Sequence, residues 1–161
     1  MRAFLITLAA LLIHADPLSA QQPVSEYAGC YRIVAGRWDP RLTTGYHPDP
    51  RHLARAVQLD TLPLLGWPME YLKGARQARV LSLPADTVWK LTYWQAMKSD
   101  SIFIGTPLSF GGFDLMVAGD VRRMTGYVTA STDQISKDHP SAVRAPVALE
   151  RVDCAQPLPP R

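Results

Sequence analysis

Hydrophobic and polar residues alternate with a period of two along much of this chain, as is typical of half-buried β-strands. The alternation is clearest between Val88 and Asp133, where short segments are separated by turn-forming residues. Gly111-Gly112 and Gly119-Asp120 are two of the predicted turns. We therefore predict a meander of four antiparallel strands at residues 88–97, 101–106, 113–118 and 124–132.

The same period predicts four more strands outside this meander, at residues 30–38, 55–62, 79–83 and 143–152. Pro146 interrupts the last of them and marks a bulge or a missing ladder bond. Residues 39–53 and 133–142 are rich in polar and turn-forming residues and are predicted to be surface loops. Residues 63–78 have no regular pattern, apart from a possible helical turn at 69–73. The expected fold is all-β, an antiparallel up-and-down barrel of about eight strands.

The two cysteines of the chain are predicted to form a disulfide. Cys30 lies at the start of the first predicted strand and Cys154 follows the end of the last. In an up-and-down barrel of eight strands these two points are neighbours at the same end. A disulfide between them would close the barrel and contribute about 4–5 kcal/mol on the chain-entropy model.

Composition fits one globular domain, because 47% of the 161 residues are hydrophobic and 19% are charged. We divide the chain into a signal peptide at residues 1–20, a barrel domain at 21–154 and a proline-rich tail at 155–161. The net charge of +3 is spread along the chain, and no basic run is interleaved with aromatic residues. Nucleic acid is therefore not an expected partner.

The N-terminus predicts export to the periplasm or the cell exterior. Met1-Arg2 is followed by an apolar run over residues 3–13 and by small residues at Ser19-Ala20, the order found in secretory signal peptides. A membrane-spanning helix needs about 18 unbroken apolar residues. Asp16 and Pro17 interrupt this run, so we do not expect an integral membrane protein.

A lipoprotein is the alternative for the N-terminus, because the residues preceding Cys30 resemble the end of a bacterial lipobox. Polar residues such as Gln21 and Glu26 separate the apolar run from Cys30, whereas a lipobox follows its apolar region directly. The disulfide remains the favoured role for this cysteine.

The predicted strand order resembles that of lipocalin-like (calycin) barrels. Gly29 and Tyr31 stand where such barrels often have Gly-x-Trp, and Arg151 lies where a basic residue packs over that ring. The chain departs from the pattern because Tyr replaces Trp and no helix follows the last strand. The resemblance implies a cup that binds small, largely apolar molecules.

The predicted ligand site is an aromatic and aliphatic stripe facing the cup. Alternation puts Trp89, Leu91 and Tyr93 on one strand face, opposite Trp94. The complete predicted set is Trp89, Leu91, Tyr93, Ile102, Ile104, Phe113 and Leu115. Eight strands enclose a space that holds one small ligand or is filled by side chains, and both alternatives stay open here.

The working hypothesis is thus a barrel that binds a small hydrophobic or amphipathic ligand. The first rival is a filled barrel that contacts a cell-envelope partner through exposed aromatic residues such as Trp67, Tyr71 and Trp94. An enzyme is the second rival, but Ser99 and Ser101 lack the context of a catalytic nucleophile. We therefore predict no catalytic residues.

Strand polarity predicts that three histidines, His47, His52 and His139, share the rim opposite the disulfide. Imidazoles can bind zinc or a haem iron, with His139 the best axial candidate and nearby aspartates as further ligands. The histidine spacing matches no established metal motif. The sequence accordingly predicts no metal and no cofactor.

Overall fold

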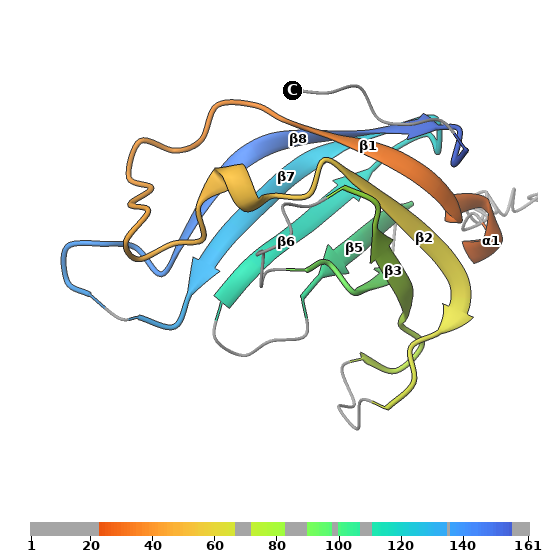
Figure 1. The fold of residues 1–161 in the computed structure, drawn as a ribbon, viewed down its shortest axis with the longest axis horizontal. Coiled ribbons are helices and arrows are strands. Elements are labelled where there is room, and N and C mark those ends of the chain that lie inside the picture. Colours follow the sequence, from red (N-terminus) through yellow and green to blue (C-terminus); the bar gives the residue numbers. More distant parts are fainter. Residues whose placement is uncertain are drawn as a thin grey trace, which may run out of the picture.

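The computed structural model describes residues 23–66, 72–82, 90–97, 100–106, 111–134 and 136–155. Its strands form one closed antiparallel barrel, in which each strand pairs with its sequence neighbours and β1 pairs with β8 (Figure 1). The elements are α1 (Val24–Tyr27), β1 (Gly29–Ala35), the 3₁₀ helix η1 (Pro50–His52), β2 (Ala56–Pro63), β3 (Arg76–Val80), β4 (Tyr93–Ala96), β5 (Ser101–Gly105), β6 (Gly111–Ala118), β7 (Arg123–Thr132) and β8 (Ala142–Val152). The predicted all-β, eight-stranded up-and-down barrel is confirmed.

The predicted signal peptide, residues 1–20, lies outside the described residues, as do residues 156–161 of the predicted tail. None of the helices in the described part of the chain has the length and apolarity that a membrane crossing requires.

Strand boundaries differ from the predicted ones mainly around β3 and β4. β3 begins at Arg76, three residues before the predicted start, and ends at Val80. Arg76 already pairs with Trp94 of β4. Residues 90–92, which the alternation placed within a longer strand, precede β4. The Thr92 backbone N–H donates to the Gly105 carbonyl oxygen at 3.0 Å, while Tyr93 is the register partner of Gly105. The alternation is therefore interrupted between Leu91 and Tyr93.

Gly111 and Gly112 were predicted as a turn, but they begin β6 and pair with Thr132 and Ser131 of β7. Gly111 has φ 100°, and a side chain there would meet the Ser131 carbonyl oxygen. Glycine allows both the positive φ and this close approach of the two strands. The residues that looked like a turn signal thus extend the β6–β7 ladder to the rim.

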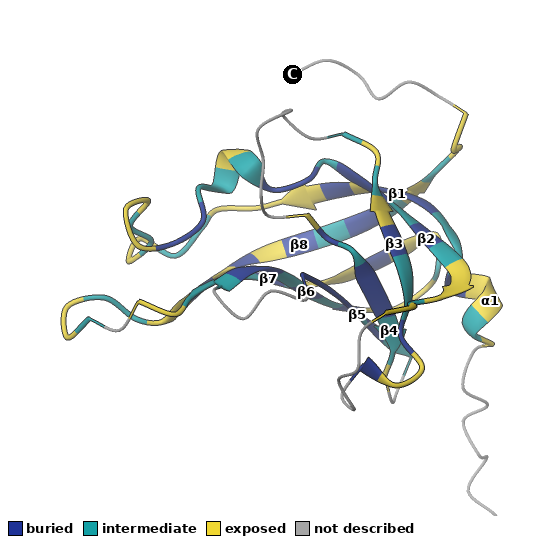
Figure 2. Ribbon diagram, turned by 60° about the horizontal axis from the view of Figure 1, so that its bottom comes forward, coloured by how far each residue is buried: buried dark blue, intermediate teal, exposed yellow. Residues whose placement is uncertain are grey.

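Side chains fill the centre of the barrel. Ile102 and Ile104 on β5 and Phe113 and Leu115 on β6 have exposed fractions of 0% and belong to one hydrophobic cluster. Buried and exposed positions alternate along the long strands (Figure 2). Pro146 was predicted to mark a bulge or a missing ladder bond, but β8 continues through it. The register of β8 with β1 ends at the next residue, Val147.

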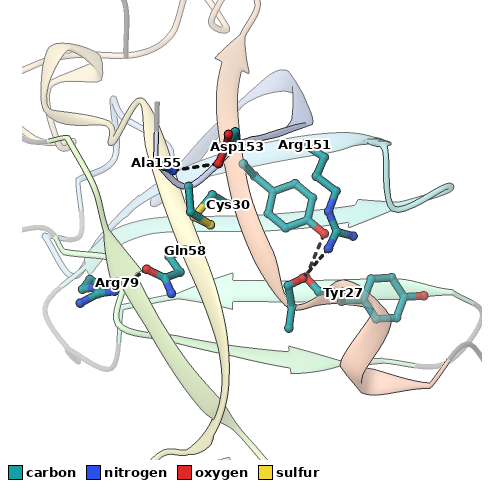
Figure 3. Close-up of a disulfide and its surroundings, with 10 residues drawn as sticks. Tyr27, Cys30, Gln58, Arg79, Arg151, Asp153 and Ala155 are labelled. Carbon is teal, nitrogen blue, oxygen red and sulfur yellow. Dashed lines mark hydrogen bonds between the residues drawn. A yellow bond between two sulfur atoms is a disulfide. The ribbon is translucent and has the colours of Figure 1, made fainter. Parts of the chain in front are cut away.

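The base of the barrel is closed by α1 and the end of β8 (Figure 3). The Tyr31 hydroxyl donates to the Tyr27 carbonyl oxygen at 2.9 Å. The Arg151 guanidinium donates to the carbonyl oxygens of Glu26, at 3.0 Å, and Ala28, at 2.8 Å. It also lies over the Tyr31 ring, 5.9 Å from the centroid. Burial raises the pKa of Tyr31, so this phenol stays neutral and keeps its donor proton.

Trp94 completes the base from inside, and the expectation that it is an exposed contact residue is wrong. Its side chain has an exposed fraction of 0% and lies edge-on to the Tyr27 ring at 6.4 Å. The indole Nε1–H donates to the Asp60 carbonyl oxygen at 2.8 Å. The β4–β5 register pairs Trp94 with Ile104, whose side chain is in the core, and paired residues share a face.

The disulfide between Cys30 and Cys154 is present at this end, with a Cα–Cα distance of 5.2 Å (Figure 3). Cys30 is buried against the barrel, whereas Cys154 is exposed. The predicted closure of the barrel by one disulfide is therefore confirmed.

A second hydrophobic group, which we call the outer cluster, consists of the buried residues Leu72, Ala75 and Tyr93 with Leu64 and Phe103 packed against them. The Tyr93 and Phe103 rings are 5.7 Å apart. Leu64, Leu72 and Ala75, from the described ends of the β2–β3 connection, thus pack on the outer surface of β4 and β5, where Tyr93 lies.

Candidate binding site at the barrel rim

Among the described residues, two long connections project from the barrel end opposite α1, one between β1 and β2 and the other between β7 and β8 (Figure 1). Polar and turn-forming residues dominate both, which favours loops over regular strands. Their contacts with each other decide the shape of the rim.

His47 joins the two connections. Its ring is buried, with an exposed fraction of 4%. The backbone N–H of Thr43 donates to His47 Nδ1 at 3.2 Å, and Nε2 lies 2.8 Å from the Pro140 carbonyl oxygen. Because a carbonyl oxygen can only accept, Nε2 carries a proton and donates to Pro140. Both ring nitrogens are engaged, so this histidine has a structural role.

His139 forms a second link between the connections. Its Nδ1 lies 3.3 Å from the Thr43 hydroxyl oxygen. Its ring packs on the Tyr46 ring at a centroid distance of 4.3 Å and an angle of 33°. The links through His47 and His139 hold the two connections together at the rim.

Two of the rim aspartates are held by arginines two residues further along the chain. The guanidinium and the backbone N–H of Arg51 both donate to the Asp49 carboxylate, and these bonds lower the pKa of Asp49 to about 2. Arg41 lowers the pKa of Asp39 to about 2 in the same way. Asp49 caps η1, which places His52 at the end of that helix.

Between these segments lies a cavity of about 450 Å³, which we call the rim pocket. It is formed by the β1–β2 connection on one side and by the end of β7 with the residues that follow it on the other. Its lining consists of Thr44, Gly45, Tyr46, His47, Pro48, Asp49, His52, Ser131, Thr132, Asp133 and Gln134. The volume lies within the range of about 300–1,000 Å³ that is usual for small-molecule sites.

Of the rim histidines proposed from the sequence, His47 and His52 line this pocket, while His139 supports it through Tyr46. No three His, Cys, Asp or Glu side chains converge as a metal site within the described ranges. The arrangement can form hydrogen bonds to a ligand through hydroxyl, imidazole, carboxylate and amide groups.

The stripe predicted as the ligand site is divided by the structure. Leu91 joins the same core cluster as the predicted residues on β5 and β6, and its exposed fraction is 1%. Tyr93 lies in the outer cluster instead, and Trp89 is outside the described residues. The described members therefore do not line one common surface.

Asp114 is the one described carboxyl group whose pKa is raised, and burial is the main cause. The backbone N–H of Thr106 donates to it and partly offsets this effect. Asp114 follows Phe113 on β6 and precedes Leu115, both of which point inward, so its side chain points outward. It lies against Gly105 of β5. The enzyme hypothesis needs a general acid or base with a shifted pKa inside the cup. The Asp114 carboxyl group has a raised pKa but points outward, so it does not meet that requirement.

The pocket residues Thr44, Thr132 and Gln134 were not proposed from the sequence. Nothing in their local pattern distinguishes them from other polar loop residues. Strand polarity, which predicted that these connections share a rim, was the available signal.

Comparison of the chain with protein-family models, curated proteins and solved structures gives no match.

Proposed function

We propose that this protein is exported and binds a small amphipathic molecule at the open rim of its barrel. The observation that carries this proposal is the rim pocket of about 450 Å³ between the β1–β2 connection and the end of β7. The expected ligand-binding role of the barrel is kept, while the site moves from the depth of the cup to its mouth.

Packing in the core supports this position. Leu115 and Phe113 have exposed fractions of 0%, and Trp38, from the β1–β2 connection, lies 6.1 Å from the Phe113 ring. A ligand among these side chains would have to displace them, which close-packed interiors resist. The rim pocket needs no such displacement, and its lining mixes polar side chains with Tyr46 and Pro48, as an amphipathic ligand requires.

The export part of the proposal is supported by the Cys30–Cys154 disulfide, since such bonds persist in oxidising compartments. The apolar N-terminal run with its small residues at Ser19-Ala20 supplies the corresponding signal. Cell fractionation tests this part. Recovery of a chain that keeps residues 1–20 from the cytoplasm would refute it.

The binding part is tested by native mass spectrometry of the protein purified from an oxidising compartment, compared with the same sample denatured but not reduced. We expect an excess mass in the native spectrum that His52→Ala and Gln134→Ala reduce. Tyr93→Ala, in the outer cluster, is the control and should retain the mass. Loss of the mass in Tyr93→Ala or Trp89→Ala, with the rim variants unaffected, would return the site to the predicted stripe.

A filled barrel that binds a cell-envelope protein is the second candidate, and one feature of the outer surface favours it. One cross-strand row carries no charged residue: Ser101, Ala118, Thr125, Ala148 and Val34. Val34 is 43% exposed. A photo-crosslinker at position 34 should then capture a protein that the same group at Thr61 does not. Equal labelling at both positions would remove this candidate.

A further inference from the structure

We propose that the rim pocket takes an uncharged, polyhydroxylated ligand of the chemical class of the saccharides. This inference rests on the proposed binding function and deepens it by naming the class of the polar group that enters the pocket. Three properties of the lining carry it: its charge, its hydrogen-bonding groups and its aromatic ring.

The lining is poorly suited to an anion. None of the described residues that line the rim pocket is a Lys or an Arg, although the chain contains 17 of them. Its charged side chains are carboxylates, Asp49 and Asp133. Asp49 is already paired with Arg51 at 2.6 Å, which leaves Asp133 to set the charge that a ligand meets. A fatty acid or a phosphate would face this carboxylate without a compensating cation from the lining.

Hydrogen-bonding groups surround the pocket on both sides. Thr44 and Tyr46 bring hydroxyls from the β1–β2 connection, and His52 brings an imidazole. Thr132 and Gln134 face them from the end of β7; the Thr132 hydroxyl oxygen accepts the Gln134 backbone N–H at 3.1 Å and keeps its own proton for donation. A purely apolar ligand would take these groups out of water without replacing their hydrogen bonds.

Tyr46 supplies the surface on which a sugar ring can pack. It is 38% exposed, lines the pocket and is supported by the His139 ring at 4.3 Å. The C–H face of a sugar ring is apolar and complements an aromatic face, while its hydroxyls point outward to polar groups. His47 and His139 hold the ring and the loop in place before binding, which lowers the entropy cost of recognition.

The first experiment compares three ligands that share a pyranose ring and differ in charge: the neutral N-acetylglucosamine, the cationic glucosamine and the anionic glucuronate. Saturation-transfer NMR and calorimetry on the full mature protein would measure their binding, with cellobiose and maltose as larger neutral probes. We expect a neutral sugar to bind and glucuronate to bind at least about tenfold more weakly. Tighter binding of glucosamine than of every neutral sugar would overturn the assignment in favour of an organic cation.

Variants then locate the site. Tyr46→Ala should weaken binding of the best neutral sugar about tenfold or more, and Thr132→Val should weaken it several-fold. Thr125→Val is the matched control, because Thr125 is also on β7 but is exposed and outside the lining. Tyr46→Phe keeps the ring and should retain most of the affinity. Unchanged affinity in both Tyr46→Ala and Thr132→Val would refute the rim location.

Failure of the ligand class can be told apart from failure of the proposed function. The same calorimetry with dodecyltrimethylammonium and with dodecanoate tests amphiphiles that lack a sugar. If one of them binds and loses affinity in Thr132→Val while no sugar binds, the saccharide class is wrong and the rim site stands. If neither sugars nor amphiphiles bind, both proposals are refuted.

Discussion

Removing the Cys30–Cys154 disulfide should destabilise the barrel mainly through its unfolded state. Arg151, near the end of β8, still holds the carbonyl oxygens of Glu26 and Ala28 in the folded protein, at 3.0 and 2.8 Å. The two chain ends therefore stay together without the covalent bond. The unfolded chain, by contrast, loses a constraint between residues that are 124 positions apart.

The size of the effect follows from that separation. On the chain-entropy model a cross-link closing a loop of 124 residues contributes about 5 kcal/mol at 25 °C. With a urea m-value of about 2 kcal/mol/M, this corresponds to a fall of about 2–3 M in the unfolding midpoint. Cys30 is 1% exposed and is best replaced by Ala, because Ser would bury a hydroxyl, whereas the exposed Cys154 tolerates Ser.

The assay is equilibrium urea unfolding of the C30A/C154S double variant and of the unaltered protein, with and without reductant. The reduced protein should unfold at the midpoint of the double variant, which separates loss of the cross-link from loss of the cysteine side chains. A difference below about 1 kcal/mol between oxidised and reduced protein would refute the reasoning, since the unfolded state would then already keep its ends close.

Three further predictions concern urea unfolding. Gly126→Ala places a methyl group against the Met116 carbonyl oxygen on β6 and should cost about 2–3 kcal/mol. Gly45→Ala is its control, because no atom lies within 4 Å of the added carbon, and equal losses in both would contradict the close approach of β6 and β7. Asp114 has a folded-state pKa above its ordinary value of 3.8, so its ionisation costs stability as pH rises through the folded pKa. Asp114→Asn should therefore raise the midpoint at pH 7 relative to the unaltered protein, and the gap should close below about pH 3.8; a constant gap would rule out titration as its cause. Arg151→Ala removes two charged hydrogen bonds at the base and should cost about 1.5–3 kcal/mol, whereas an unchanged midpoint would mean that water replaces them.

The barrel was predictable because its information is local or topological. Alternation over residues 101–106 and 124–132 identifies strands without knowledge of their partners, and β5 and β7 lie there. Simple up-and-down order then brings the ends of the chain together, which is why the positions of Cys30 and Cys154 were enough to predict their bond.

Prediction failed where a side chain's face depends on its partners. Trp94 was expected outside the barrel, but pairing with Ile104 turns it inward. Leu91 and Tyr93 are two residues apart and were placed on one face, yet they belong to different clusters. The Thr92 N–H bonds to the Gly105 carbonyl oxygen although Tyr93 is the register partner of Gly105, so the alternation is interrupted between Leu91 and Tyr93. Period-two arguments hold only within a continuous strand, and the sequence does not show where pairing begins.

The amino-acid sequence by itself determined the fold class, the strand order and the end of the barrel at which the cysteines meet, since these follow from local periodicity and chain connectivity. Only the tertiary structure decided that the described cup residues pack against one another and that Thr44 and Thr132 line a common pocket. That pocket depends on His47 and His139, which form hydrogen bonds across 93 and 96 positions of sequence. Contacts between loops have no period along the chain, so they become visible only when the barrel brings the loops together.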